Sequence, residues 1–430
     1  MSAVAWLPSA ALPETDFPLA NLPYGAFSAP GREARIGVAI GDQIFDLRAA
    51  DAIGLLATLP EPLRAVCRQP VLNPLMGLDP VLVGQLRRHC TELLCAGPQG
   101  ERERSARALL PQAEATLRLP ADIGDYTDFY ASIHHATNVG KLFRPNNPLL
   151  PNYRHIPVGY HGRSSSVVVS QEKIRRPAGQ LPGAEGEAPA FGPTRQLDYE
   201  LEVGVFIGQG NALGHPIPLA QAEGHIFGLC LLNDWSARDM QRWEYQPLGP
   251  FLAKNFATTI SPWVVTMEAL APYRVAAGAR GPGDPALLPY LDSPADRGTG
   301  GVDLSVEVWL QTERMREQKV PAVRLSRGNL RDLYWTLGQL LTHHTSNGCN
   351  LRPGDLLGTG TISGPEPEAR GCLLEITSAG RQPVTLPGGE TRAFVEDGDE
   401  VVLRAYCHKP GAPRIGWGEC RGRIVPTVEV

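Results

Sequence analysis

The chain has 430 residues, of which 43% are hydrophobic and 20% charged, and its formal net charge is −5. This composition is typical of a folded globular protein and excludes the disordered and fibrous classes, and the length predicts two domains, one of them large. The net charge and the lack of a dense lysine and arginine run argue against a nucleic-acid partner. No stretch of apolar residues is long enough for a membrane span. The first twenty residues, interrupted by prolines and acids, are not typical of a signal peptide, so we expect a cytoplasmic location.

The N-terminal third mixes strand and helix patterns. Residues 35–48 alternate apolar positions and turn at Gly41 and Asp42, which predicts a β-hairpin. Residues 78–97 have helical spacing, with Asp79 as a capping residue, Pro80 at the first helical position and a glycine after the end.

After about residue 119 the pattern changes to many short β-type runs, interrupted by helical segments at 236–245 and 329–348. Gly/Pro-rich connectors occupy residues 178–193 and 271–301. The chain is therefore predicted to be mainly β with α+β elements, divided into domains at 1–118 and 119–430. The predicted strand runs are SSSVVVS, DYELEVGVFIG, VDLSVEVWLQ, CLLEIT, EVVLRAYC and RIGWGEC.

The eight cysteines are scattered without a C-x-x-C pair. This spacing fits neither a zinc site nor a dense disulfide framework. We expect reduced and mostly buried thiols.

Acidic residues alternate at the start of the run DYELEVGVFIG. If this segment is a strand, Asp198, Glu200 and Glu202 share one face. Three carboxylates on one face repel each other unless they are solvated or a cation lies among them. For the segment alone, a solvent-exposed face is at least as plausible as a metal site, although the buried character of the residues that follow favours the metal.

A second polar pattern follows the apolar run LCLLN. We interpret Asp234 as the N-cap of the helix that follows. Spacings of 4, 3 and 4 then place four polar residues in one stripe, which is either the solvent face or the wall of a pocket. These residues are Asp234, Arg238, Gln241 and Tyr245.

Four carboxylates near predicted strand ends or turns are candidate ligands of one metal ion. An all-oxygen set without cysteine suits Mg²⁺ or Ca²⁺ rather than zinc. The alternative, that they are ordinary surface acids, stays open because the sequence does not show that they converge. The four are Asp128, Glu200, Glu202 and Asp234.

The adjacent histidines His134 and His135 are candidates for a catalytic base. On a strand they would point to opposite faces, so at most one is expected to act, and a lone histidine is more often structural. His343 and His344, near a predicted helix end, serve as a comparison and are interpreted as residues favoured by the helix dipole. The Gly-rich stretch 354–367 either brings its backbone close to a small ligand or is simply a turn.

Several long motifs resemble the fumarylacetoacetate hydrolase family, nearly from end to end. They include DYTDFYASIHHATNVG, LLPNYRHIPVGYHGRSSSVVVS, NDWSARDMQRWEYQPLGPFLAKNF and GDLLGTGTISGPEP. The resemblance implies an SH3-like N-terminal barrel, a C-terminal mixed β-sandwich roll and a homodimer with its active site in the C-terminal domain. The implied reaction is hydrolysis of a carbon–carbon bond in 4-fumarylacetoacetate, a small diketo acid, at the last step of tyrosine and phenylalanine breakdown.

The resemblance also assigns roles to individual residues. His135 matches the general base and Glu375 the acid that orients it, while Arg238, Gln241 and Lys254 would face the tetrahedral oxyanion. The implied metal ligands are the four acids above, with two further residues linked to a magnesium ion: Lys254 and Thr258. The implied substrate contacts are Tyr130, Arg144, Tyr160, Gln241, Tyr245 and Thr361.

Two alternatives remain at this point. A related acylpyruvate hydrolase or oxaloacetate decarboxylase would use the same acidic cluster, although a decarboxylase would not need the pair of His135 and Glu375. A divalent-ion-binding structural protein would need neither residue for its function.

Overall fold

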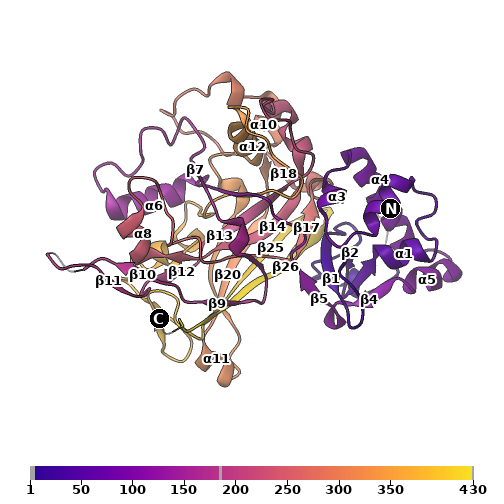
Figure 1. Cartoon of the computed structure of the whole chain (residues 1–430), viewed down its shortest axis with the longest axis horizontal. Coiled ribbons are helices and arrows are strands. Elements are labelled where there is room, and N and C mark those ends of the chain that lie inside the picture. Colours follow the sequence, from indigo (N-terminus) through magenta and orange to yellow (C-terminus); the bar gives the residue numbers. More distant parts are fainter. Residues whose placement is uncertain (1–4, 184–185, 429–430) are drawn as a thin grey trace.

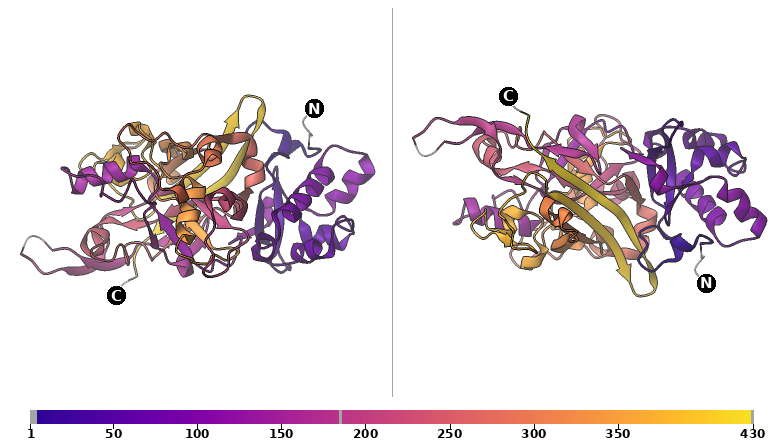
Figure 2. Two further views of the ribbon diagram at one scale, coloured as in Figure 1. Left: turned by 90° about the horizontal axis from the view of Figure 1, so that it is seen from above. Right: turned by 90° about the horizontal axis from the view of Figure 1, so that it is seen from below.

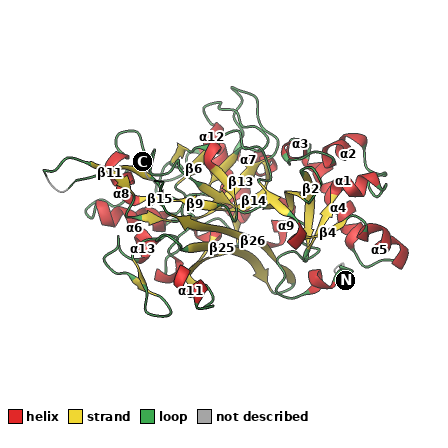
Figure 3. Ribbon diagram, turned by 60° about the horizontal axis from the view of Figure 1, so that its bottom comes forward, coloured by secondary structure: helices red, strands yellow, loops and turns green. Residues whose placement is uncertain are grey.

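The computed structural model describes residues 5–183 and 186–428. Residues 1–4 of the segment tested for a signal peptide, and residues 184–185 of the first connector, lie outside the described residues. The indigo N-terminal residues form a smaller unit beside the larger remainder of the chain (Figure 1). Strands occupy the centre of the larger unit and helices lie around them (Figure 3).

Within the described residues, a 13-stranded sheet runs through both units in the order β4-β3-β2-β1-β17-β14-β13-β22-β6-β7. β5 pairs with β1, while β16 pairs with β14 and β8. The strands are β1 (Tyr24–Ser28), β2 (Arg35–Ile40), β3 (Gln43–Asp46), β4 (Leu109–Pro111), β5 (Thr116–Arg118), β6 (Tyr126–Phe129), β7 (Gly159–His161), β8 (Val167–Val169), β13 (Leu201–Ile207), β14 (Ile226–Asp234), β16 (Thr258–Ile260), β17 (Trp263–Thr266) and β22 (Leu356–Gly358).

A five-stranded sheet of order β21-β20-β25-β26-β9 packs against the large sheet. Its strands are β9 (Lys173–Arg175), β20 (Ser305–Gln311), β21 (Val323–Asn329), β25 (Glu400–Lys409) and β26 (Ala412–Val425). The hydrophobic core lies between the two sheets, where Val203 and Leu231 of the first join Val308 and Leu403 of the second. The long hairpin of β25 and β26 extends toward the N-terminal unit (Figure 2).

Smaller elements complete the fold. The two-stranded pairs are β10 (Ala178–Leu181) with β11 (Ala190–Pro193), β12 (Leu197–Asp198) with β15 (Ser236–Ala237), β18 (Arg274–Val275) with β19 (Gly301–Val302), and β23 (Val384–Thr385) with β24 (Thr391–Arg392). The α-helices are α1 (Leu47–Ala52), α2 (Glu61–Cys67), α3 (Asn73–Met76), α4 (Pro80–Leu94), α5 (Gln99–Ala106), α6 (Ile133–Phe143), α7 (Leu219–Ala222), α8 (Arg238–Glu244), α9 (Met267–Leu270), α10 (Pro294–Thr299), α11 (Glu313–Glu317), α12 (Leu337–Thr345) and α13 (Leu373–Ile376). Among the described residues, none of these helices combines the length and apolar character required to cross a bilayer.

The predicted class, mainly β with mixed sheets, is confirmed. Most strand pairs are antiparallel, but β16 with β8, β22 with β6, and β26 with β9 are parallel. The N-terminal strands continue into the large sheet through β1 and β17, where Tyr24 pairs with Val264. The finer description of the N-terminal unit as an SH3-like barrel stays a prediction.

The local predictions in the N-terminal unit are also confirmed. β2 and β3 form the hairpin, and Gly41 takes a φ of 56° at its turn, a conformation that glycine adopts without steric cost. The predicted helix is α4, in which the carboxylate of Asp79 accepts a hydrogen bond from the backbone N–H of Val81. The eight cysteines are free thiols and mostly buried, as expected.

One predicted strand is wrong, because CLLEIT forms the helix α13 rather than a strand. The carboxylate of Asp198 accepts hydrogen bonds of 2.9 Å from the backbone N–H groups of Leu373 and Leu374, and so caps this helix from 175 residues away. A short apolar run does not by itself distinguish a strand from a buried helix. The predicted helical segments are confirmed with narrower bounds, as α8 and α12.

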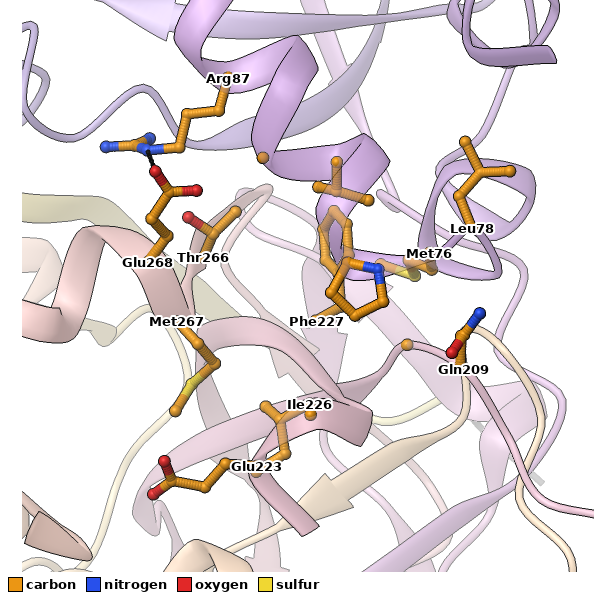
Figure 4. A pocket seen from close by; sticks show the side chains of 15 residues that line it. Met76, Leu78, Arg87, Gln209, Glu223, Ile226, Phe227, Thr266, Met267 and Glu268 are labelled. Atoms are coloured by element: carbon orange, nitrogen blue, oxygen red, sulfur yellow. Dashed lines mark ion pairs between the residues drawn. The ribbon is translucent and has the colours of Figure 1, made fainter. Parts of the chain in front are cut away.

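A pocket of about 140 Å³ lies where α3 and α4 meet the large sheet (Figure 4). Its lining is largely apolar, with Met76 and Phe227 facing each other across the junction. At one side, Arg87 Nε lies 3.9 Å from a carboxylate oxygen of Glu268. None of the lining residues belongs to the predicted site, so this pocket is separate from the residues considered next.

Candidate active site

The four predicted metal ligands come together at one edge of β6, β13 and β14. Asp128 lies in β6, Glu202 in β13 and Asp234 at the end of β14, while Glu200 immediately precedes β13. One ligand oxygen from each of the four lies within 4.8 Å of the others, and all four residues are buried. The central strands are covered on both faces and are therefore almost continuously apolar. The four acids lie at or near the ends of these strands.

Burial and mutual repulsion shift the pKa values of the acids in this cluster. Burial, followed by the neighbouring carboxylate of Asp234, raises the pKa of Asp128 to about 8. Burial, followed by the charge of Asp128, raises the pKa of Glu202 well above its usual range. Asp128 Oδ1 and Glu202 Oε1 have no hydrogen-bond partner among the described residues. Two buried carboxylate oxygens of the cluster thus lack a hydrogen-bond donor among the described residues.

Lys254 and Thr258, which the resemblance linked to the ion, do contact the cluster. Lys254 Nζ donates to Glu200 Oε2 at 2.6 Å and to Asp234 Oδ2 at 2.7 Å. Thr258 Oγ1 donates to Asp234 Oδ1 at 2.9 Å. Burial would raise the pKa of Glu200, but the cations Lys254 and Arg238 outweigh it and lower that pKa below its usual range. Glu200 is therefore the acid of the cluster that is ionised most readily.

These residues fit a divalent cation. The four clustered carboxyl groups are buried, and the ion pairs among the described residues give them only two cations: Arg238 pairs with Glu200, and Lys254 pairs with Glu200 and Asp234. The pairing of β22 with β6 places Gly358 opposite Asp128, and a Cβ at Gly358 would lie 2.5 Å from Asp128 Oδ1 and 2.9 Å from Glu202 Oε2. The absence of a side chain at Gly358 leaves room beside these two oxygens. An all-oxygen donor set of this kind suits a hard divalent ion.

His135 forms a close pair with Glu375. His135 lies in the first turn of α6, whose N-cap Ser132 accepts a hydrogen bond from the backbone N–H of His135. Its Nδ1 lies 2.6 Å from Glu375 Oε2, and both residues are buried. Burial would raise the pKa of Glu375, but His135 and donated hydrogen bonds outweigh it and bring it to about 2. An ionised carboxylate only accepts hydrogen bonds, so Nδ1 carries the hydrogen and Nε2 remains free to accept a proton.

Tyr130 connects this pair to the acidic cluster. Its ring meets the His135 imidazole edge to face at a centroid distance of 5.2 Å. Burial raises the pKa of Tyr130, and the charges of Glu200 and Glu375 raise it further. His135 in turn contributes to lowering the pKa of Glu200. The base candidate and the metal-ligand candidates therefore belong to one site.

The histidine pair lies on a helix, so the argument from opposite strand faces does not apply. In α6, His135 is buried while His134 is only half-buried. The other pair, His343 and His344, occupies the last turn of α12 as predicted. His344 Nε2 lies 2.9 Å from the hydroxyl of Thr127, which adds a contact that the sequence did not suggest.

The alternative that Asp198, Glu200 and Glu202 form a solvent-exposed face is wrong. Only Glu200 and Glu202 belong to the acidic cluster. All three are buried, and the strand is interrupted between β12 and β13. Asp198 instead caps α13 and accepts a hydrogen bond of 2.9 Å from Arg238 Nε. Arg238 Nη1 donates to Glu200 Oε1 at 2.6 Å, so this arginine joins the α13 cap to the cluster.

The predicted cap and stripe after LCLLN need correction. Asp234 ends β14, and Ala237 is the N-cap of α8, so Asp234 is not a helix cap. Tertiary contacts with Lys254 and Thr258 hold its carboxylate instead. Of the stripe, Gln241 lies beside Arg238, whose Nη1 donates to Gln241 Oε1 at 3.1 Å, and Tyr245 is 37% exposed.

Of the predicted substrate contacts, some hydrogen-bond to the acidic cluster and others do not. The hydroxyl of Tyr160 donates to Asp234 Oδ2 at 3.0 Å, and Thr361 Oγ1 is buried with no hydrogen-bond partner among the described residues. Arg144 follows α6 and donates to the carbonyl of Pro148 at 3.4 Å. The hydroxyl of Tyr245 accepts a hydrogen bond from its neighbour in the chain. Tyr160 therefore contacts the cluster, whereas the hydrogen bonds of Arg144 and Tyr245 are made elsewhere.

Sequence reasoning missed several polar residues around Glu375. Asn138, Ser363 and Cys372 each direct a donor at its carboxylate. The one available signal was the spacing of Asn138, three residues after His135 and hence on the same side of a helix. Cys372 is the N-cap of α13, three residues before Glu375, but its segment was predicted to be a strand. Ser363 carries no such signal because it approaches from a loop that is distant from His135 in the sequence.

The chain matches known proteins over nearly its whole length. It matches the family model described as "Fumarylacetoacetase N-terminal" at residues 20–120 and that described as "Fumarylacetoacetate (FAA) hydrolase C-terminal" at residues 125–425. It is 50% identical to the fumarylacetoacetase of Bos taurus, over 96% of this chain and 97% of the relative. Its identity to the fumarylacetoacetase of Caenorhabditis elegans is 49%, with the same coverage.

A comparison of structures agrees with this result at the level of the fold. The solved structure of a fumarylacetoacetate hydrolase from Exiguobacterium antarcticum superimposes with a TM-score of 0.50 at 16% identity, over 94% of this chain and 99% of the other. The two family models and the identity to full-length relatives carry the assignment further. The chain belongs to the fumarylacetoacetate hydrolase family.

Proposed function

We propose that the chain hydrolyses a carbon–carbon bond of 4-fumarylacetoacetate and releases fumarate and acetoacetate. The observation that carries this function is the buried pair of His135 and Glu375, which the loop of residues 360–363 connects to a cluster of four buried carboxylates. Relatives with about half of their residues identical over the full chain are fumarylacetoacetases, which supports the same activity here. The reaction would be the last step of tyrosine and phenylalanine breakdown.

The acidic cluster would hold Mg²⁺ or Ca²⁺ through Asp128, Glu200, Glu202 and Asp234. When bound, such an ion supplies Lewis-acid chemistry, which polarises the diketone oxygens of the substrate. The oxygen-only donors support these two ions over softer metals. Thr258 and Lys254 would fix the carboxylate of Asp234 in place.

His135 would act as the general base. Nε2 takes a proton from a water molecule, and the water oxygen attacks the carbonyl carbon at which the bond will break. Glu375 keeps the hydrogen on Nδ1 and stabilises the imidazolium that forms. The carbon–carbon bond then breaks, its electron pair leaves with the acetoacetate fragment, and that fragment takes up a proton.

Cationic and amide donors would stabilise the oxyanion that water attack creates. Arg238, Gln241 and Lys254 are the candidates, and one preorganised donor typically contributes about 3 to 4 kcal/mol to the transition state. Arg238 and Lys254 are now held by carboxylates, so they are positioned before substrate arrives. The proposed substrate contacts are Tyr130, Arg144, Tyr160, Gln241, Tyr245 and Thr361.

The remaining finer assignments are part of the same proposal. They are a domain boundary between 1–118 and 119–430, an SH3-like N-terminal barrel, a homodimer, and a cytoplasmic location. The junction between the two matched family models, at residues 120–125, supports the boundary.

The decisive experiment compares substrates and one variant. The purified chain is assayed by loss of diketone absorbance with fumarylacetoacetate and with acylpyruvates, and His135→Ala is assayed in parallel. We expect fumarylacetoacetate to be turned over faster and His135→Ala to lose activity by orders of magnitude while it stays folded. Faster turnover of acylpyruvates would favour the related hydrolase, and an active His135→Ala variant would refute the base assignment.

A further inference from the structure

Glu375 is held by more groups than the histidine it orients. Asn138 Nδ2 donates to Glu375 Oε1 at 2.8 Å, while Ser363 Oγ donates to Glu375 Oε2 at 2.8 Å. Cys372 Sγ lies 3.3 Å from the same Oε2. Both oxygens of the carboxylate therefore have a donor besides His135, which leaves the group little freedom to rotate.

Ser363 also supports the other side of the pair. Its carbonyl oxygen accepts a hydrogen bond of 2.8 Å from Ser132 Oγ, and Ser132 Oγ accepts the backbone N–H of His135. Its hydroxyl accepts the backbone N–H of Gly371 at 3.0 Å, which fixes the direction in which Ser363 can donate. A closed chain of hydrogen bonds thus runs from the N-cap of α6 through Ser363 to α13.

The same loop reaches the acidic cluster. Three residues before Ser363, the backbone N–H of Gly360 donates to Glu202 Oε2 at 3.0 Å. Residues 360–363 therefore contact a candidate metal ligand at one end and the base-orienting carboxylate at the other. These residues belong to the Gly-rich stretch 354–367, for which the sequence left open a ligand-binding loop or a simple turn. In the structure this stretch connects the acidic cluster to Glu375.

We propose that Ser363 and Asn138 are positioning residues, which clamp the two oxygens of Glu375 so that His135 presents Nε2 to the attacking water. The inference rests on the proposed function, in which His135 is the base. Ser363 is fully buried and Asn138 half-buried, so loss of either donor leaves a carboxylate oxygen with fewer partners. A base displaced by a fraction of an ångström loses much of its rate, while binding of the substrate at other groups is little changed.

The test compares Ser363→Ala and Asn138→Leu with a matched control. Ser261 is also fully buried and its hydroxyl accepts a backbone N–H, that of Leu231, but it has no contact with Glu375. We expect both clamp variants to lower kcat about tenfold to hundredfold with KM within about twofold. Ser261→Ala should keep kcat, and all three should bind Mg²⁺ or Ca²⁺ in calorimetry as the parent does.

A double-mutant cycle separates positioning from a general structural effect. In a His135→Ala background there is no base to position, so adding Ser363→Ala should change the residual kcat by less than about twofold. An equal loss in both backgrounds would overturn the proposal, as would an unchanged kcat or a loss confined to KM in the single variants. If Ser363→Ala fails to fold, the half-buried Asn138→Leu decides by the same criteria.

The two proposals fail in different ways. If His135→Ala is inactive but both clamp variants have parental kcat, only the clamp is wrong. If His135→Ala keeps parental activity, the base assignment itself is wrong, whatever the clamp variants do.

Discussion

Gly358 lies directly against the carboxylate of Asp128, because β22 and β6 pair these two residues in register. A Cβ at Gly358 would come within 2.5 Å of Asp128 Oδ1, closer than real carbon–oxygen contacts allow. Asp128 Oδ1 is one of the two buried carboxylate oxygens of the cluster that have no hydrogen-bond partner in the described part of the chain.

Gly358→Ala should therefore weaken ion binding. The methyl group forces Asp128 or Glu202 away from the other ligands, and we expect the Kd for Mg²⁺ or Ca²⁺ to rise at least tenfold in titration calorimetry. Gly192→Ala, where an added Cβ meets nothing within 4 Å, is the matched control and should bind as the parent does. An unchanged Kd for Gly358→Ala would show that the ion is not held at these oxygens.

Removal of divalent ions should destabilise the protein as well as inactivate it. Without a cation, buried carboxyl groups must repel one another or take up protons, as the raised pKa values of Asp128 and Glu202 indicate. At a free ion concentration of about 100 times Kd, binding contributes about 2.7 kcal/mol to the free energy of unfolding. Thermal unfolding with chelator and with restored Mg²⁺ or Ca²⁺ measures this, and equal melting temperatures would contradict it.

Glu375→Gln should separate catalysis from ion binding. The amide keeps the shape of the side chain but cannot stabilise an imidazolium, so kcat should fall by about a hundredfold or more. Because Glu375 is not one of the four clustered acids, the Kd of the divalent ion should stay the same. Steady-state kinetics with calorimetry on the same samples provides the test, and a loss of ion binding equal to that of Gly358→Ala would count against the division of roles.

The charge of Glu375 should make stability depend on acid pH. Its pKa is about 2 in the folded protein against an ordinary value of 4.5, so its contribution is fully present above about pH 4.5 and is lost as pH falls toward 2. One pKa unit corresponds to about 1.4 kcal/mol, which gives a contribution on the order of 3 kcal/mol. In urea unfolding with chelator present, the difference between parent and Glu375→Gln should shrink from pH 6 to pH 3. A difference that is constant with pH would contradict the assignment of this charge.

Asp198→Ala should lower the free energy of unfolding, although Asp198 is not one of the four clustered acids. The variant removes the cap of α13 and leaves the buried guanidinium of Arg238 with one carboxylate fewer. Breaking a buried pair in this way typically costs about 3 to 5 kcal/mol. Equilibrium unfolding measures the loss, and Asp198→Asn, which retains one acceptor oxygen, should lose less. Equal losses in the two variants would show that the cap contributes little.

The sequence by itself determined the chemistry that is available and much of the local structure. The turn at Gly41, the cap at Asp79 and the last-turn histidines of α12 follow from contacts between neighbours in the chain, so their residue patterns predict them. The long family motifs likewise predicted that the four acids are metal ligands and that His135 is the base.

Only the tertiary structure decided which of these groups meet. Asp128 lies near Glu202 because β22 pairs with both β6 and β13. Glu375 lies near His135 because it belongs to α13, a helix that Asp198 caps and that the sequence of residues 372–377 does not distinguish from a strand. Asp198 does not belong to the cluster of four acids, because its carboxylate caps α13. Contacts between residues far apart in the chain depend on strand register and burial, and these are properties of the whole packed sheet rather than of any single segment.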